Sequence, residues 1–157
     1  MIENPEKLAD RLAVEGQKCL DYFKSLPPAD WKVKLYTDGS QWDIQDLLAH
    51  FVSAEQANQH LVNYIMAGGE GAPVDFNINV FNEKDVERLC LLPIGELLQN
   101  FSSLRQSLVN LVLQMRNEDL IKTGYHPFLG FATVADIIKL VYRHNQIHIR
   151  DVKRILN

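Results

Sequence analysis

The residues best suited to chemistry are two histidines near the C-terminus, His144 and His148, within the segment Arg143 to Asp151. Their i, i+4 spacing places both imidazoles on one face of a helix, one turn apart. Two imidazoles so placed can bind one metal ion. Such a pair also arises by chance, so the spacing alone is equally consistent with two hydrogen-bonded structural histidines.

The phase of this pair favours the metal site. Counting helical steps from Ile137 and Val141, the apolar stripe reaches positions 144 and 148 and continues at Val152. Both histidines are therefore expected to face inward. Burying two neutral imidazoles costs several kcal/mol unless their nitrogens find partners, and a bound metal ion is a partner for both.

A third ligand would complete such a site. His50 and His60 lie on one predicted helix, ten positions or about 15 Å apart, so at most one of them can join it. His50 borders an apolar stripe, whereas His60 is expected nearer solvent. His126 lies in a proline-flanked loop whose reach the sequence does not fix. Asp46, one turn before His50, is expected either to orient that imidazole or only to favour the helix N-terminus.

No other standard catalytic pattern is present, because the chain lacks H-E-x-x-H, Glu-x-x-His, a phosphate-binding glycine loop and G-x-S-x-G. Neutral imidazoles with few carboxylates suit zinc, nickel or another borderline divalent ion better than magnesium or calcium. Three protein ligands leave coordination positions open for water or substrate. Cys19 and Cys90 form no C-x-x-C, and we expect both to be buried spectators.

The elements that must position these side chains are helical. Four long segments carry apolar residues at helical spacing and strand-like alternation is almost missing, which predicts an all-α fold. The first helix is expected to begin at Pro5, with Asn4 as its N-cap, and to end before Pro27. The second is expected to begin near Trp42 and to end at Gly68.

The second half of the chain continues this pattern. A lead-in from Asn82 to Cys90 precedes a third helix from Pro93 to Met115, and Thr133 is expected to cap the last helix. Residues 117–131 are expected to be irregular, and the loop from Glu70 to Asn79 to cross over the end of the bundle. We therefore predict a four-helix bundle with long crossover loops.

The composition limits the possible functions. With 157 residues, 46% hydrophobic and 23% charged, residues 1–157 have the size of a single domain whose core needs no metal for stability. The 16 basic and 20 acidic residues give a net charge of −4, which excludes general nucleic-acid binding. The chain shows neither a signal-like start nor an apolar run of about 20 residues, so we expect a cytoplasmic protein with no membrane partner.

Several segments together resemble a known family. The segment from Trp42 to Glu55, WDIQDLLAHFVSAE, resembles the second-helix entry of the DinB-like superfamily, which includes mycothiol-dependent maleylpyruvate isomerases and related thiol-S-transferases. The closing segment from Arg143 to Asp151 resembles the H-x-x-x-H of that family's final helix. The piece from Val74 to Asn82 is more weakly similar to a lead-in of some members. The combination of these short motifs covers nearly the whole chain.

The resemblance implies an up-down-down-up bundle, commonly a homodimer, with one divalent metal ion held by His50, His144 and His148. It also implies that the metal binds a low-molecular-weight thiol, lowers its pKa and presents the thiolate to a small electrophile. The expected function is therefore that of a metal-dependent thiol-S-transferase or isomerase. The alternatives are a non-catalytic bundle that sequesters a small molecule or toxin, and a structural bundle with hydrogen-bonded histidines.

Further residues are expected near such a cavity. Asn82 and Tyr142 are candidates for its lining. Arg143 or Arg150 is expected either to hold a substrate carboxylate or to lie in solvent, paired with Asp151 or a glutamate.

Overall fold

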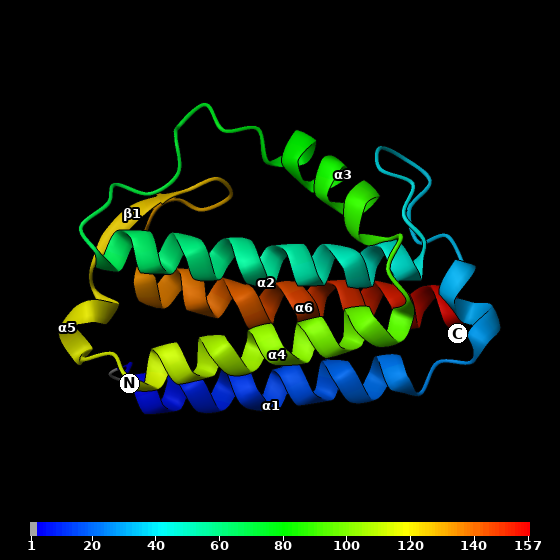
Figure 1. Cartoon of the computed structure of the whole chain (residues 1–157), viewed down its shortest axis with the longest axis horizontal. Coiled ribbons are helices and arrows are strands. Elements are labelled where there is room, and N and C mark those ends of the chain that lie inside the picture. Colours follow the sequence, from blue (N-terminus) through cyan, green and yellow to red (C-terminus); the bar gives the residue numbers. More distant parts are fainter. Residues whose placement is uncertain (1–2) are drawn as a thin grey trace.

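Four long helices lie side by side in the computed structural model, which describes residues 3–157 (Figure 1). Their bounds are α1 Pro5–Lys24, α2 Ile44–Met66, α4 Ile94–Leu113 and α6 Val134–Leu156. Helices α1 and α6 run in one direction and α2 and α4 in the other, so the topology is up-down-down-up. The predicted four-helix bundle is confirmed.

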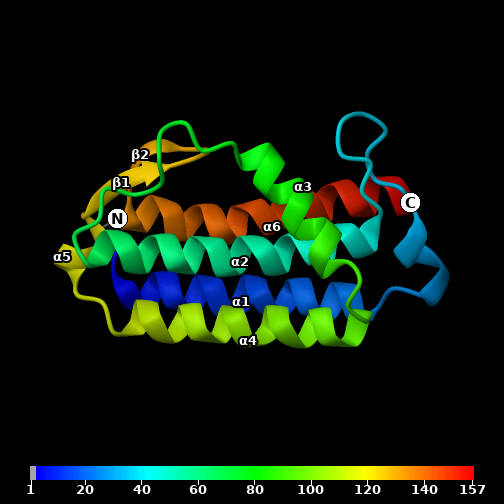
Figure 2. The ribbon, with the colours of Figure 1, turned by 45° about the horizontal axis from the view of Figure 1, so that its top comes forward.

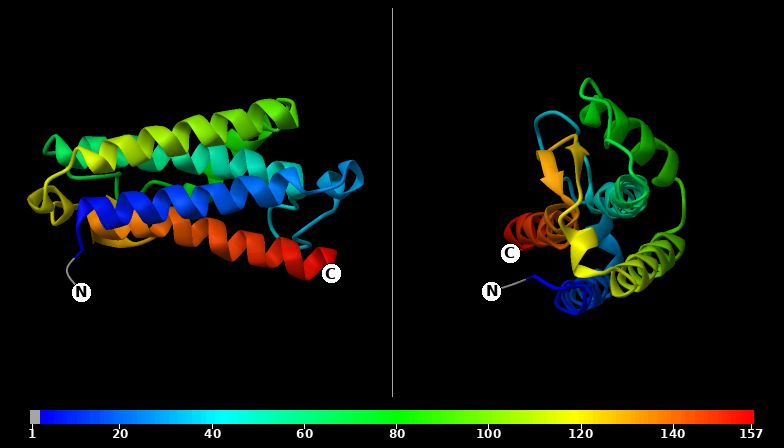
Figure 3. Two further views of the ribbon diagram at one scale, coloured as in Figure 1. Left: turned by 90° about the horizontal axis from the view of Figure 1, so that it is seen from below. Right: turned by 90° about the vertical axis from the view of Figure 1, so that its left-hand side faces the viewer.

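The neighbours around the bundle follow from the contacts between helices. Each of α1 and α2 packs against both α4 and α6, so α2 and α6 are adjacent, as the end-on view in Figure 3 shows. None of the helices among residues 3–157 is long and apolar enough to cross a membrane.

Side-chain caps explain why three of these helices begin where the sequence predicts. Asn4 accepts a backbone hydrogen bond at the start of α1. Asp43 and Asp46 form a reciprocal capping box at the start of α2, and Thr133 and Asp136 form one at the start of α6. These side chains satisfy backbone donors that the first turn of a helix leaves unpaired.

Because α2 and α4 run in the same direction, the chain must return along the bundle between them. It does so through residues 67–77 and α3 (Ile78–Leu89), which packs along the outside of α2 (Figure 2). The prediction that this connection crosses the end of the bundle is wrong. Helix α3 also begins before Asn82, because Asn77 caps it through two backbone N–H groups. Only two residues of α3 are buried, which is why its apolar pattern is weak.

The segment predicted to be irregular before α6 is ordered. It contains the single-turn helix α5 (Asn117–Leu120) and an antiparallel hairpin of β1 (Thr123–His126) and β2 (Gly130–Thr133). Strands of four residues are too short to produce a readable alternation of apolar and polar residues. The loop between α1 and α2 likewise contains a 3-10 helix, η1 (Pro28–Lys32).

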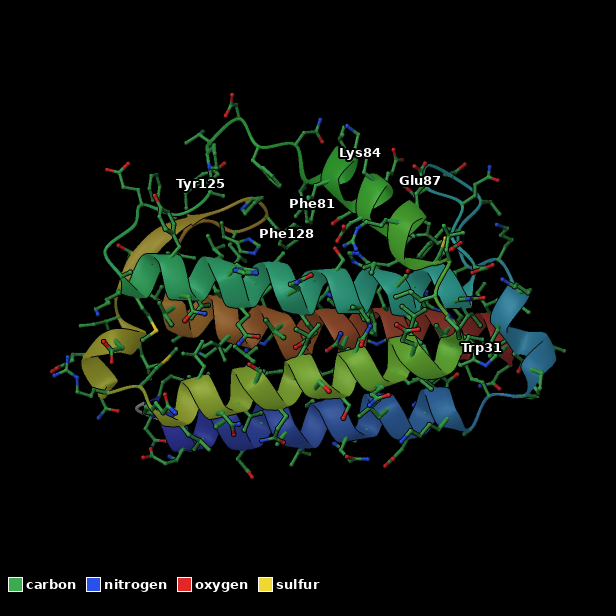
Figure 4. The ribbon with its side chains drawn as sticks, viewed as in Figure 1. Trp31, Phe81, Lys84, Glu87, Tyr125 and Phe128 are labelled. Atoms are coloured by element: carbon green, nitrogen blue, oxygen red, sulfur yellow. The ribbon has the colours of Figure 1, made fainter. Side chains whose placement is uncertain are left out.

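His126 fastens this hairpin to the bundle. Its Nδ1 lies 3.0 Å from the backbone N of Phe128 and 3.2 Å from that of Leu129, so it accepts both hydrogen bonds. The ring hydrogen is therefore on Nε2, which donates to the side-chain oxygen of Asn58 on α2 at 3.0 Å. His126 is thus a structural residue. Figure 4 shows Phe128 and Phe81 of α3 on the same side of α2.

Two hydrophobic clusters fill the interior of the bundle. One includes the N-terminal half of α1 and the N-terminal half of α6. The other includes the C-terminal half of α1 and the N-terminal halves of α2 and α4, around the fully buried Phe23, Phe51 and Phe101. The ring centroid of Phe51 lies 5.7 Å from that of Phe23 and 6.2 Å from that of Phe101. Burial of one such side chain contributes about 1.5–3 kcal/mol.

Arg105 of α4 is buried in this interior and contacts all three other long helices. Its guanidinium forms an ion pair with Glu55 of α2, and the two side chains are only 4% and 2% exposed. It also donates to the carbonyl oxygen of Leu12 in α1 at 2.9 Å and to the side-chain oxygen of Asn145 in α6. Gly16 leaves room for it, because a Cβ there would lie 2.8 Å from the arginine Cγ.

We expect Arg105→Ala to lower the free energy of unfolding by about 3–5 kcal/mol, because it leaves the Glu55 carboxylate buried without its partner. Urea unfolding followed by circular dichroism measures this loss. The control is Arg116→Ala, which removes an ion pair whose arginine is 73% exposed and should change stability by no more than about 1 kcal/mol. Equal losses in the two variants would contradict the central role of Arg105.

Candidate metal centre

Three histidines from two neighbouring helices meet at one point. Nε2 of His144 lies 2.9 Å from Nε2 of His50 on α2 and 3.1 Å from Nε2 of His148 on its own helix. The ligand-capable atoms of the three rings all lie within 4.8 Å of one another. His50 is buried and the two α6 histidines are half-buried, so the cluster lies at the edge of the core.

Hydrogen bonds among the three rings satisfy this arrangement only in part. A neutral imidazole nitrogen carries either one hydrogen or one lone pair, so Nε2 of His144 would have to share it between two other Nε2 atoms. A tetrahedral metal ion about 2.0–2.1 Å from each nitrogen would hold the nitrogens about 3.3 Å apart. The observed separations of 2.9 and 3.1 Å are close to that value. The three side chains therefore fit a divalent ion.

Burial keeps the three rings neutral. Burial, with a smaller effect of His148, lowers the pKa of His50 to about 3. Burial is the main cause that lowers the pKa of His144 to about 2, and the nearby His50 and His148 lower it by smaller amounts. Burial also lowers the pKa of His148, although Asp151 opposes this shift. At neutral pH each ring is therefore uncharged and keeps a lone pair on one nitrogen, as metal coordination requires.

Aromatic side chains surround the cluster on the side of the core. The ring of Trp42 lies 4.7 Å from that of His50, and the ring of Phe51 lies 5.7 Å from His144 and 5.9 Å from His148. These apolar walls lower the local dielectric constant, which strengthens electrostatic interactions at the site.

The contacts of Asp46 show that its carboxylate does not orient His50. Its carboxylate accepts a hydrogen bond from the backbone N of Asp43 at 3.0 Å, within the capping box of α2. Nδ1 of His50 is buried and has no hydrogen-bond partner. The other expectation for Asp46, a role at the helix N-terminus, is the one that the structure supports.

Two of the remaining candidates, Tyr142 and Arg143, have other surroundings than the three rings. Tyr142 belongs to the hydrophobic cluster shared with α1, where the guanidinium carbon of Arg11 lies 5.5 Å from its ring centroid, so it does not line the site. Asn82 is half-buried on α3, and His60 is exposed, as expected. Arg143 is exposed and lines an open groove of about 240 Å³ between β2 and α6.

A second open groove, of about 300 Å³, lies between α1 and α6. Its lining includes Arg150, Asn145 and Ile149, which point away from the face that carries His144 and His148. This groove is therefore separate from the histidine cluster.

Tyr36 contacts the cluster although the sequence did not single it out. Its hydroxyl oxygen lies 2.7 Å from Nδ1 of His148 and 3.0 Å from Oδ2 of Asp151. Asp151 was considered only as a partner for arginine, yet its position three residues after His148 places it on the same helix face. Tyr36 lies in an irregular loop, where no periodicity could have revealed its position.

Comparison with known proteins assigns the chain to a family. The profile of the DinB superfamily matches residues 11–152, and the chain belongs to this superfamily. No functionally curated protein shows significant sequence similarity to it.

Solved structures share the fold. YfiT from Bacillus subtilis, described as a probable metal-dependent hydrolase with an unusual four-helix bundle topology, has a TM-score of 0.77 at 13% identity, over 96% of this chain and 85% of YfiT. A mycothiol-dependent maleylpyruvate isomerase has a TM-score of 0.75 at 13% identity, over 96% of this chain, which spans 61% of that protein. An uncharacterized protein from Clostridium difficile 630 has a TM-score of 0.73 at 16% identity, over 100% and 99%.

Neither cysteine belongs to the histidine cluster. Cys19 is 4% exposed, and burial raises the pKa of its thiol to about 12. Cys90 is half-buried rather than buried as expected, and burial followed by the nearby Asp46 raises its pKa. A thiol that reacts at the histidine cluster would therefore be an added small molecule.

We expect a disulfide reagent at mildly alkaline pH to modify Cys90 at least about ten times faster than Cys19, because the thiolate is the reacting form and Cys19 is both inaccessible and hard to ionise. The release of the chromogenic thiol measures the two rates. Cys90→Ser should leave only the slow phase, and concentrated urea should make both thiols react in the wild type. A fast Cys19 in the Cys90→Ser variant would refute this expectation.

Proposed function

We propose that this chain is a divalent-metal-binding protein in which His50, His144 and His148 hold one zinc, nickel or similar ion. The observation that carries the proposal is the convergence of three neutral imidazole rings from two helices, in which Nε2 of His144 faces Nε2 of both His50 and His148. Imidazole ligands suit these ions. Three protein ligands leave at least one coordination position for an added molecule.

The first test is metal content. Protein prepared without a polyhistidine tag should bind about one divalent ion per chain, and His50→Ala and His148→Ala should each lose it, since two imidazoles bind far more weakly than three. Elemental analysis measures the ion, and circular dichroism checks that the variants remain helical. His60→Ala is the matched control, because His60 is exposed on the same helix as His50 and should leave the metal content unchanged.

Two results would contradict the metal site. One is a folded His148→Ala protein with the metal content of the wild type. The other is a wild-type protein that binds no ion even after titration with zinc and nickel.

We further propose that the open coordination position accepts a low-molecular-weight thiol, and that the protein is a thiol-S-transferase or isomerase acting on a small electrophile. A bound divalent ion would lower the pKa of such a thiol, so that it reacts as the thiolate. Three neutral histidines leave the ion's positive charge uncompensated, which favours an anionic fourth ligand.

The chemistry of the ligand set suits a thiolate. Among residues 3–157 the cluster of possible ligands contains histidines only, so no carboxylate ligand would offset the charge of the ion. A thiol ionises more readily than water, and its thiolate is a strong nucleophile. Trp42 and Phe51 would exclude water from one side of the reacting group.

Turnover tests this activity. Metal-loaded protein, given an excess of low-molecular-weight thiols and small electrophiles, should form product in amounts many times its own concentration, and His148→Ala should form none. Mass spectrometry of the products measures this. Consumption of the electrophile that stops at one equivalent per chain would instead support the alternative, a sequestering protein. Product that forms without any thiol would support a hydrolase, as YfiT is described.

The homodimer implied by the family resemblance and the cytoplasmic location stay predictions.

A further inference from the structure

The loop before α2 brings two aromatic residues to the histidine cluster. Residues 33–43 fold back on themselves, since the backbone N of Leu35 donates to the carbonyl oxygen of Trp42 at 2.9 Å. This closure places Trp42 against His50, with ring centroids 4.7 Å apart, and Tyr36 against His148, with centroids 6.1 Å apart. The loop therefore contacts ligands from both helices of the site.

The hydroxyl group of Tyr36 has one hydrogen and two polar neighbours. It lies 3.0 Å from Oδ2 of Asp151 and 2.7 Å from Nδ1 of His148. An aspartate carboxylate can only accept a hydrogen bond, so the hydroxyl hydrogen is directed to Asp151. The hydroxyl oxygen must then accept the hydrogen carried by Nδ1 of His148.

This chain of hydrogen bonds fixes the tautomer of His148. A neutral ring with its hydrogen on Nδ1 has its lone pair on Nε2, the atom that lies 3.1 Å from Nε2 of His144. His50 has no comparable support, because its buried Nδ1 lacks a partner.

We propose that Tyr36 and Asp151 are positioning residues of the metal site, which hold His148 in the tautomer and orientation that present Nε2 to the ion. This inference rests on the proposed metal binding. Tyr36 acts through His148 and does not coordinate the ion itself, and it couples the 33–43 loop to helix α6. Residues that orient a histidine ligand in this way typically affect metal affinity by about 10–100-fold.

The first measurement is zinc affinity, by competition with a chromophoric chelator. Tyr36→Phe keeps the ring but removes the acceptor for Nδ1–H, and we expect zinc affinity to fall about 10–100-fold while helicity is retained. Tyr22→Phe is the matched control, since Tyr22 is also half-buried beside α6, under the ammonium group of Lys153. That variant should bind zinc as tightly as the wild type.

The second measurement is the tautomer of His148 in the metal-free protein, from nitrogen NMR of the histidine rings assigned with His148→Ala. We expect hydrogen on Nδ1 in the wild type and a substantial fraction on Nε2 in Tyr36→Phe. A purely structural role for Tyr36 would change thermal stability without moving this equilibrium.

Three results would contradict either the positioning role of Tyr36 or the metal binding on which it rests. A wild-type protein that binds zinc together with a Tyr36→Phe variant that binds it equally tightly would overturn the positioning role. Hydrogen on Nε2 of His148 in the wild type would also overturn it. A wild type that binds no metal would overturn the proposed function, and the tautomer measurement would still test the hydrogen-bond chain on its own.

Discussion

The buried guanidinium of Arg105 is the interaction on which the geometry of this bundle depends. It reaches Glu55 on α2, Asn145 on α6 and the backbone of α1 from its own position on α4. A buried ion pair is a weak source of net stability, because desolvation offsets most of the attraction. Its directional hydrogen bonds nevertheless restrict how the four helices can rotate and slide, and an apolar core alone would permit several such packings.

That restriction determines where the histidines lie. Asn145 must face the interior to meet Arg105, and the preceding residue on a helix is rotated by about 100°. His144 and His148 therefore lie at the edge of the core beside α2, half-buried, instead of fully inward as the apolar stripe predicts. This shift leaves one side of the cluster outside the core, whereas a fully interior position would leave no access for a further ligand.

The parts of the structure that local sequence determines were predictable. Asn4, Asp43 and Thr133 cap their helices with hydrogen bonds that depend only on neighbouring residues, and the i, i+4 pair on α6 is likewise local. His50 was favoured over His60 as the third member because it borders the apolar stripe of its helix, and the family resemblance implied the same residue.

What the sequence could not show depends on contacts between distant segments. The β1–β2 hairpin owes its position to His126 and Asn58, which are far apart in the chain. Tyr36 reaches His148 across an even larger separation of 112 positions. The role of Asp46 could not be predicted for a related reason. Its carboxylate could bind the first turn of its own helix or a side chain one turn away. The structure shows that it accepts a hydrogen bond from the backbone N of Asp43.

The irregular segments lie on one face of the bundle, outside the helical core. One fold can host different chemistries because such outer segments differ while the core is kept. In Figures 1 and 2 the 33–43 loop, α3 and the hairpin all lie on the same side, over α2. Helix packing fixes the positions of the three histidines, and the fold itself is shared with YfiT at 13% identity. Loops and other segments outside the core vary more readily in length and side chains than the helices do. In this chain the 33–43 loop also reaches the edge of the core, because Tyr36 bonds to His148. A change in that loop would therefore alter the surroundings of two histidines at once, because Trp42 lies against His50 and Tyr36 bonds to His148.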